Sequence, residues 1–214
     1  MKEVVCHQIS HSYDGVRNAV NHLSLSIKAG EVMALIGPNG AGKSTTMSIL
    51  AGLISPTAGT CEIRGLSSAQ EMPIIRTFLG MCPQHNVLFP KLTVDDHMRC
   101  FAVLKGAVFG DLTAVVDEAL REVGLFDKKD AIATTLSGGQ KRKLSLAIAM
   151  LGGSSVVFLD EPTSGMDPYV SHPIFFCGLV FVVLTCKHKA HFHKTRTKRI
   201  VDVCVFDLIV LIRA

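Results

Sequence analysis

The chain has 214 residues, of which 48% are hydrophobic and 19% charged, and its formal net charge is +4 at pH 7. This length fits one domain, or one domain with a small lobe, and is long enough to bury a hydrophobic core. The seven cysteines are odd in number and form no C-x-x-C pair, which argues against a disulfide framework or a zinc site and favours a reducing compartment. The first residues hold no signal-peptide core. No run reaches the ~18 apolar residues that a membrane span needs, and residues 174–186 come nearest.

The positive charge is concentrated at the C-terminal end. Residues 1–170 carry 15 lysines and arginines against 16 acidic residues, whereas the remainder carries seven against two. The run 187–199 is basic and rich in histidine, a composition typical of a solvated face or a flexible segment. Nucleic acid is therefore not expected as a partner.

The first part of the chain predicts strands with one helix among them. Residues 4–9 are expected to form an edge strand, and residues 23–27 alternate strictly between apolar and polar, as a half-buried strand does. Residues 32–36 form a short apolar run typical of a buried strand. Residues 46–51 contain no helix breaker and predict a helix, and residues 60–64 predict another short strand.

A glycine-rich loop joins the strand at 32–36 to the helix and matches the pattern G-x-x-x-x-G-K-[ST]. The loop consists of Gly37, Pro38, Asn39, Gly40, Ala41, Gly42, Lys43, Ser44 and Thr45. Its glycines let backbone N–H groups surround phosphate oxygens at the positive end of the helix dipole. Lys43 would reach the β- and γ-phosphates, and the Ser44 hydroxyl would ligate Mg²⁺. A glycine turn in an unrelated α/β protein is the alternative, but strand, loop, lysine and helix together predict a nucleoside triphosphate site.

The middle of the chain predicts a helical subdomain. Residues 94–104 and 112–123 both carry apolar residues at intervals of three and four. Thr93 is expected to begin the first of these helices, because Asp95 and Asp96 would lie in its first turn. This subdomain would be inserted between two halves of an α/β core.

A third helical pattern follows residue 137. Leu144, Ala147, Ile148 and Leu151 would share one face, and residues 141–143 are expected to begin a mixed, solvated face.

The next segment, residues 156–159, is a continuous apolar run of the buried parallel-strand type, and it ends in Asp160 and Glu161. Asp160 could hold Mg²⁺ beside Ser44. Glu161 could polarise the water that attacks the γ-phosphate. Behind a complete phosphate loop, this pair predicts hydrolysis as well as binding.

The most specific stretch is Leu136-Ser137-Gly138-Gly139-Gln140. A serine caps the helix that follows, and the glycines expose N–H groups that can bind a phosphate. An ordinary helix cap is expected to explain the serine but not the paired glycines or the glutamine. Here the sequence resembles the nucleotide-binding domain of ABC transporters, whose signature is LSGGQ, and the resemblance covers residues 3–169.

The resemblance implies an α/β fold: a P-loop NTPase core with a mixed, mainly parallel sheet and flanking helices, an antiparallel β subdomain and a helical signature subdomain. Residues 1–169 would be the ATP-binding domain, with the helical subdomain at about 86–152, and ATP and Mg²⁺ would be the cofactors. Tyr13 resembles the aromatic residue that stacks on adenine. Gln84 resembles the glutamine that senses Mg²⁺ and nucleotide.

The resemblance also implies partners. Two such domains would enclose two ATP molecules head to tail, so that Ser137, Gly138, Gly139 and Gln140 contact the ATP of the partner domain and Asp167 crosses the dimer interface. Residues 86–91 would contact a membrane-spanning domain, which would place the chain at the cytosolic face of a membrane. A lone copy is expected to bind ATP but hydrolyse it poorly.

Within the family, residues 37–46, 80–86, 141–145 and 159–169 resemble the A subfamily of eukaryotic transporters, which is associated with lipids. One alternative is the ATPase subunit of a bacterial-type exporter. Soluble ABC ATPases of DNA repair and translation fit less well, because Leu136 lies only 93 positions after Lys43 and the chain holds one copy of the motifs.

The resemblance ends after residue 169. The family pattern continues with a polar helix and a strand that ends in a switch histidine followed by acidic residues. His188, His191 and His193 lie near the expected position, but no Asp-Glu follows any of them. Residues 170–214 are therefore interpreted as an atypical C-terminal segment, and a hydrolysis-deficient, ATP-binding regulatory module is an alternative function.

Overall fold

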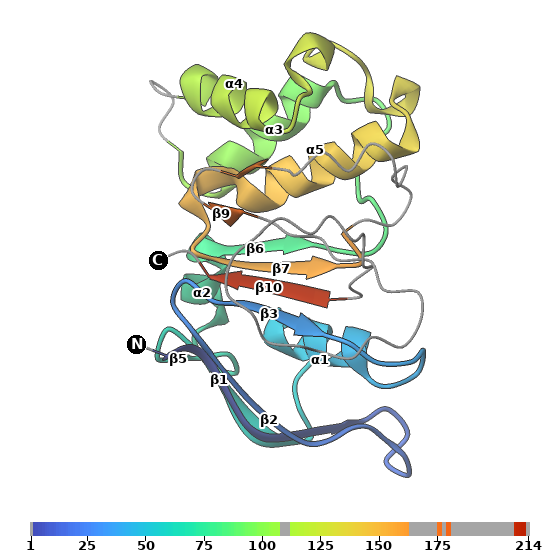
Figure 1. Ribbon diagram of the computed structural model, residues 1–214, viewed down its shortest axis with the longest axis vertical. Coiled ribbons are helices and arrows are strands. Elements are labelled where there is room, and N and C mark those ends of the chain that lie inside the picture. The colour runs from blue at the N-terminus through green and yellow to red at the C-terminus, as the bar shows by residue number, and fades with distance from the viewer. Residues whose placement is uncertain (1, 108–111, 163–174, 177–178, 181–207, 213–214) are drawn as a thin grey trace.

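The computed structural model describes residues 2–107, 112–162, 175–176, 179–180 and 208–212. Figure 1 shows three regions stacked along the long axis. An antiparallel sheet lies at one end, a second sheet crosses the middle, and a group of helices covers the other end. Residues 163–174, which include Asp167, and the three candidate histidines lie outside the described residues.

The antiparallel sheet has the strand order β2-β1-β4-β5. Its strands are β1 (Lys2–Ser12), β2 (Asn18–Lys28), β4 (Ala58–Ile63) and β5 (Leu66–Ser67). The prediction of an edge strand at residues 4–9 is wrong, because β1 pairs with β2 on one side and β4 on the other. Local periodicity shows that a strand is half-buried but cannot show which later segment pairs with it.

The central sheet has the order β3-β10-β7-β6. It consists of β3 (Val32–Leu35), β10 (Leu208–Ile212), β7 (Val156–Asp160) and β6 (Leu79–Cys82). β6 is parallel to β7, while β10 is antiparallel to both β3 and β7. Three of the four strands therefore run the same way, which confirms the mixed, mainly parallel sheet. The carboxyl ends of β3, β6 and β7 share one edge, where the phosphate loop, Gln84 and Asp160 follow or end these strands.

The C-terminal segment supplies β10 in the middle of this sheet. Leu208 pairs with Leu35 and Asp160, whereas Ile212 pairs with Val156 at the beginning of β7. The carboxyl end of β10 thus lies at the edge opposite the phosphate loop. The same segment contributes the short antiparallel pair β8 (Phe175–Phe176) and β9 (Leu179–Val180).

Strand β7 separates two hydrophobic cores. Val156 and Phe158 pack into the core shared with helices α1 (Lys43–Leu50) and α2 (Met72–Phe78) and the antiparallel sheet. Val157 and Leu159 pack into the core under the helical region. This alternation is the two-residue period of a strand that is covered on both faces.

The helical region contains α3 (Val94–Leu104), α4 (Leu112–Glu122) and α5 (Gly138–Met150), with short 3₁₀ turns at Phe126–Lys128, Ala133–Thr135 and Leu151–Gly153. Thr93 caps α3, as the sequence predicted, and the structure adds a reciprocal capping box between Thr93 and Asp96. Helix α5 is buried on all sides from Leu144 to its end at Met150. It packs closely on β6, where a Cβ on Gly80 would lie 2.0 Å from the carbonyl oxygen of Ala149. None of the helices in the described part of the chain is long and apolar enough to cross a membrane.

Candidate functional site

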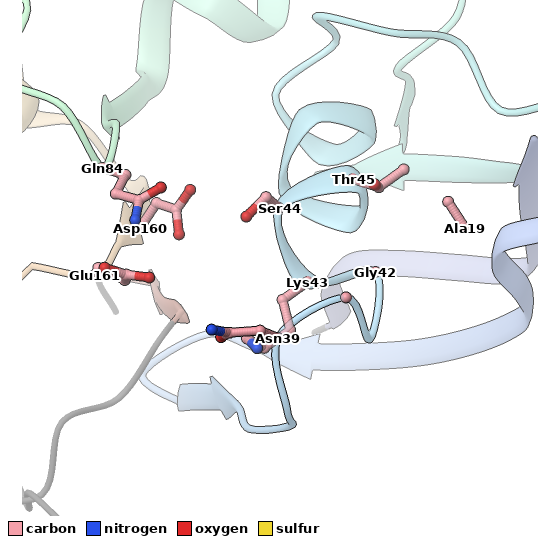
Figure 2. Close-up of a pocket in the computed structure, with 10 residues that line it drawn as sticks. Ala19, Asn39, Gly42, Lys43, Ser44, Thr45, Gln84, Asp160 and Glu161 are labelled. Carbon is pink, nitrogen blue, oxygen red and sulfur yellow. The ribbon is translucent and has the colours of Figure 1, made fainter. Parts of the chain in front are cut away.

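A hollow of about 470 Å³ opens at the carboxyl edge of the central sheet. Figure 2 shows the phosphate loop on one side of it and Gln84, Asp160 and Glu161 on the other. The lining consists of Ala19, Asn39, Gly40, Gly42, Lys43, Ser44, Thr45, Gln84, Asp160 and Glu161. The fold therefore brings the loop at 37–45 together with the carboxylates that end β7, although more than 110 residues separate them in the sequence.

Within the phosphate loop, Gly42 has φ 86° and is the N-cap residue of α1, which has no side-chain hydrogen bond to cap it. This left-handed conformation is one that residues with a Cβ rarely adopt. The Thr46 hydroxyl donates a hydrogen bond of 2.9 Å to the carbonyl oxygen of Gly42 and ties the loop to the first turn. Helix α1 thus presents its uncapped N-terminus to the hollow, an arrangement that attracts anions.

The ammonium group of Lys43 lies folded over the loop. Its Nζ donates to the carbonyl oxygens of Gly37 at 2.6 Å and Pro38 at 2.9 Å. The ammonium group is thereby held at the rim of the hollow, close to the N-terminus of α1. The positive charge of Lys43 and the positive end of the helix dipole both favour a negatively charged ligand there.

Oxygen-bearing side chains face one another across the hollow. In Figure 2 the Ser44 hydroxyl is turned toward the Asp160 carboxylate, and Gln84 lies beside Asp160. Hydroxyl, amide and carboxylate oxygens are the hard ligands that Mg²⁺ prefers, so this donor set fits the ion. Within the described residues, no group of three or more His, Cys, Asp or Glu side chains could hold a metal alone. A Mg²⁺ ion here would need further oxygen ligands, such as phosphate or water.

Glu161 lies just beyond the end of β7 and has an unusual backbone. Its φ is 43°, in the left-handed region, which costs a residue with a side chain about 1–2 kcal/mol. Cys82, the last residue of β6, is buried, and this desolvation raises the pKa of its thiol to about 11; Arg142 lowers that pKa and Asp160 raises it by smaller amounts. Cys82 is therefore a protonated, packed side chain rather than a nucleophile.

Tyr13 lies beside the phosphate loop, outside the set of residues that line the hollow. Its hydroxyl is 3.2 Å from the Thr45 hydroxyl, and its ring meets His11 edge-on with 4.7 Å between the ring centroids. The side chain is 69% exposed. An exposed aromatic ring at this place is available for stacking.

The signature residues do not enter the hollow. Ser137 and Gly138 are exposed at the beginning of α5. The Ser137 Oγ accepts a hydrogen bond from the backbone N–H of Gln140, and the Gln140 Oε1 accepts one of 2.9 Å from the N–H of Ser137. This capping box corrects the expectation that a helix cap leaves the glutamine unexplained. The capping box does not explain why Gly138 and Gly139 are glycines.

Arg142 does not lie where the sequence predicts it. A solvated face is expected, but the side chain is 1% exposed and contacts the segments that follow β6 and β7. The available signal is that residues 144–151 are apolar apart from Ser145, because a helix that is apolar all round is buried on every face.

The loop after Gln84 forms an exposed apolar surface. Phe89 is 53% exposed, and with Pro90, Leu92 and parts of Lys91 and Cys100 it lines a second hollow of about 480 Å³. The buried His97 supports this loop, since its Nε2 accepts a hydrogen bond of 2.8 Å from the backbone N–H of Phe89. Its Nδ1 then carries the proton and donates to the carbonyl oxygen of Thr93 at 2.7 Å.

A phosphate loop, an oxygen-rich opposite wall and a strand ending in Asp-Glu define an ATP-binding domain of the P-loop type. The sequence model described as ABC transporter matches residues 20–164. The chain belongs to the ABC transporter family.

Curated relatives place it near the A subfamily, as the sequence predicted. It is 47% identical to ATP-binding cassette sub-family A member 2 of Homo sapiens over 76% of this chain and 7% of that protein. It is 46% identical to the retinal-specific phospholipid-transporting ATPase ABCA4 of Mus musculus over 74% of this chain and 7% of that one. It is 49% identical to the phospholipid-transporting ATPase ABCA3 of Rattus norvegicus over 69% and 9%, respectively. The chain thus spans less than a tenth of the length of these relatives.

Solved structures share the fold. One is the ATP-binding subunit of an ABC transporter, with a TM-score of 0.73 and 30% identity, covering 80% of this chain and 71% of the other. Another is cbiO1 of Clostridium perfringens, part of the ABC transporter complex cbiONQ, with a TM-score of 0.70 and 28% identity, covering 78% and 68%.

Proposed function

We propose that the chain binds ATP with Mg²⁺ in the hollow and hydrolyses it. The observation that carries this proposal is that one hollow is lined by the phosphate loop, Gln84, Asp160 and Glu161 together. Backbone N–H groups of the phosphate loop and the Lys43 ammonium would bind the phosphates. Ser44, Gln84 and Asp160 would hold Mg²⁺, which supplies charge neutralisation at the phosphate oxygens when bound. Glu161 would accept the proton of the attacking water.

The second ATP-binding surface would come from another copy of the domain. The exposed Ser137 and Gly138 lie outside the chain's own hollow, which supports contact with the ATP of a partner. Asp167 would lie at the same head-to-tail interface. Tyr13 would stack on adenine, because its ring is exposed beside Thr45.

Residues 86–91, which include the exposed side chains of Val87 and Phe89, would contact a membrane-spanning domain at the cytosolic face of the membrane. Two of the named relatives are phospholipid-transporting ATPases. On that likeness we infer that ATP-driven dimerisation of this domain drives the transport of a lipid.

The strand beside β7 does not itself supply a switch histidine. β10 (Leu208–Ile212) contains no histidine, and its first residue pairs with Asp160. The alternative of a hydrolysis-deficient, ATP-binding module therefore stays open as the second candidate function.

Nucleotide binding and turnover measured on one preparation test the proposal. A fluorescent ATP analogue should bind the chain in the presence of Mg²⁺, and Lys43→Ala should weaken its binding at least about tenfold because charge-assisted hydrogen bonds to phosphate are lost. Lys28→Ala is the matched control, since Lys28 is exposed at the far end of β2. The ATPase rate per molecule should rise with protein concentration.

Three results would change the conclusion. Absence of binding to the parent chain refutes the ATP site. Tight binding without turnover at any concentration selects the regulatory module. A rate per molecule that does not depend on concentration contradicts the shared, head-to-tail site.

A further inference from the structure

The guanidinium of Arg142 is buried beneath the proposed ATP site, where it lies between two loops. It is the largest side chain in the described part of the chain that is almost completely excluded from solvent, with 1% exposure. It donates five hydrogen bonds, and each one goes to a main-chain carbonyl oxygen. A guanidinium has five N–H donors, so these five bonds use its full capacity.

Two of the bonds hold the loop that follows β6. The Nη1 atom of Arg142 donates to the carbonyl oxygen of Pro83 at 2.5 Å and to that of Gln84 at 3.2 Å. Gln84 itself lines the hollow. The backbone that carries its side chain is thus fixed from below by the arginine.

The other three bonds hold the segment that follows β7. Nη2 donates to the carbonyl oxygens of Asp160 at 2.5 Å and Glu161 at 2.8 Å, and Nε donates to that of Pro162 at 3.0 Å. Successive carbonyl groups of an extended strand point to opposite sides, so three in a row cannot reach one donor group. They do so here because the φ of Glu161 is 43°.

The left-handed backbone at Glu161 therefore allows the carbonyl groups of this segment to bind Arg142 together. A residue with a side chain stays in the left-handed region only where its surroundings fix it there. The planar guanidinium supplies donors in a rigid fork, which sets both the position and the direction of the carbonyl groups that it binds. A lysine ammonium cannot reproduce that pattern, because it has three donors at a single point.

We propose that Arg142 is a positioning residue that locks the Gln84 loop to the Glu161 segment, so that the two walls of the ATP site keep one fixed relation. The proposal rests on the proposed ATPase function for its effect on turnover. Hydrolysis is sensitive to such positioning, because a displacement of about 1 Å at a reacting group can lower a rate about 100-fold. The phosphate loop lies on the other side of the hollow, so ATP binding should depend much less on this arginine.

Hydrogen exchange, ATP affinity and turnover of the full chain test the proposal in Arg142→Gln, Arg142→Lys and a control. Arg121→Gln is the matched control, because Arg121 belongs to α4 in the same helical region and its side chain is 60% exposed. In Arg142→Gln, amide exchange should rise about tenfold or more in peptides spanning both 82–86 and 158–162, and remain as in the parent elsewhere. The ATP dissociation constant should stay within about threefold, while kcat falls at least about tenfold. Arg142→Lys should give intermediate values for exchange and kcat, and Arg121→Gln should match the parent.

Each outcome decides the proposal. Unchanged exchange in the two peptides, or a rise in only one of them, overturns the link between the loops. A loss of ATP affinity equal to the loss of kcat shows a general structural role and also overturns it. If Arg142→Gln does not fold, the exchange pattern of Arg142→Lys decides by the same criteria. Failure of the parent chain to bind ATP would refute the proposed function, while the exchange data would still test the locking of the two loops.

Discussion

No side chain fits between the backbone of Gly42 and the carbonyl oxygen of Ala19, because a Cβ on residue 42 would lie 2.1 Å from that oxygen. Ala19 belongs to β2, so the antiparallel sheet presses directly on the last turn of the phosphate loop. The neighbouring side chain of Val20 would lie 3.4 Å away. The close approach and the positive φ of Gly42 together make this glycine a geometric requirement of the loop.

Substitution of Gly42 by alanine should therefore displace the loop. A main-chain carbonyl within a strand cannot move aside as a flexible side chain can, so the loop must shift and its N–H groups lose their arrangement. We expect ATP affinity to fall at least about 100-fold, or about 2.7 kcal/mol of binding free energy, because several phosphate hydrogen bonds are lost together. Equilibrium titration with a fluorescent ATP analogue measures this change.

Gly65→Ala is the matched control for Gly42→Ala. Gly65 has φ 79°, but a methyl group on its Cα would meet no atom within 4 Å, so only the backbone cost of about 1–2 kcal/mol should appear in its unfolding free energy. Its ATP affinity should equal that of the parent. Normal ATP binding by Gly42→Ala would show that the contact with Ala19 does not shape the loop.

Replacement of Glu161 by glutamine should separate binding from turnover. The amide has nearly the shape of the carboxylate but cannot accept a proton at neutral pH, so kcat should fall about 100-fold or more while ATP affinity stays within about threefold. ATP-dependent dimers should then accumulate, which light scattering after size exclusion would detect. Glu118→Gln, a change on α4 in the helical region, should leave all three quantities unchanged. Equal turnover in Glu161→Gln and the parent would exclude Glu161 as the base.

Patterns within short segments explain why much of the fold is predictable. The helix predicted at residues 94–104 has the bounds that the structure shows, because its apolar period and the Thr93 cap agree. The strand at 156–159 needs only one more residue, Asp160. The conformation of the phosphate loop is also predictable, because glycine is the residue that adopts the positive φ required at Gly42.

Features that depend on distant segments are not predictable in this way. The interior position of β1 requires β4, and the burial of Arg142 requires both the Pro83 and the Pro162 segments. The pairing of β10 with β3 joins residues more than 170 positions apart. The role of Gln140, in contrast, depends on a local contact. Its side chain accepts a hydrogen bond from the backbone N–H of Ser137, three residues earlier, in the capping box of α5.

The cap of α3 should make stability depend on pH at the acidic end. The Asp96 carboxylate accepts hydrogen bonds from the hydroxyl and the N–H of Thr93, and these bonds lower its pKa. A depressed folded-state pKa means that the stabilisation is complete above the unfolded value of about 3.9 and is lost as the pH falls through the folded value. Asp96→Asn should therefore unfold at a lower temperature than the parent at pH 7, and the difference should shrink as the pH falls below about 4. If the unfolding temperatures of Asp96→Asn and the parent differ equally at pH 7 and pH 3, the difference does not arise from the charge of the Asp96 carboxylate.

A comparison of the N-cap residues of α3 and α5 distinguishes an effect on stability from an effect on contact with a partner domain. Thr93 and Ser137 occupy the same position in two capping boxes, so each change to alanine should cost about 1 kcal/mol of unfolding free energy. Only Ser137 is proposed to contact the ATP of a second copy. Ser137→Ala should therefore weaken ATP-dependent dimerisation at least about tenfold in the Glu161→Gln background, since a hydrogen bond to a charged phosphate is lost, whereas Thr93→Ala should leave it unchanged. Equal effects of the two alanine changes on dimerisation would mean that Ser137 acts through the stability of α5 alone.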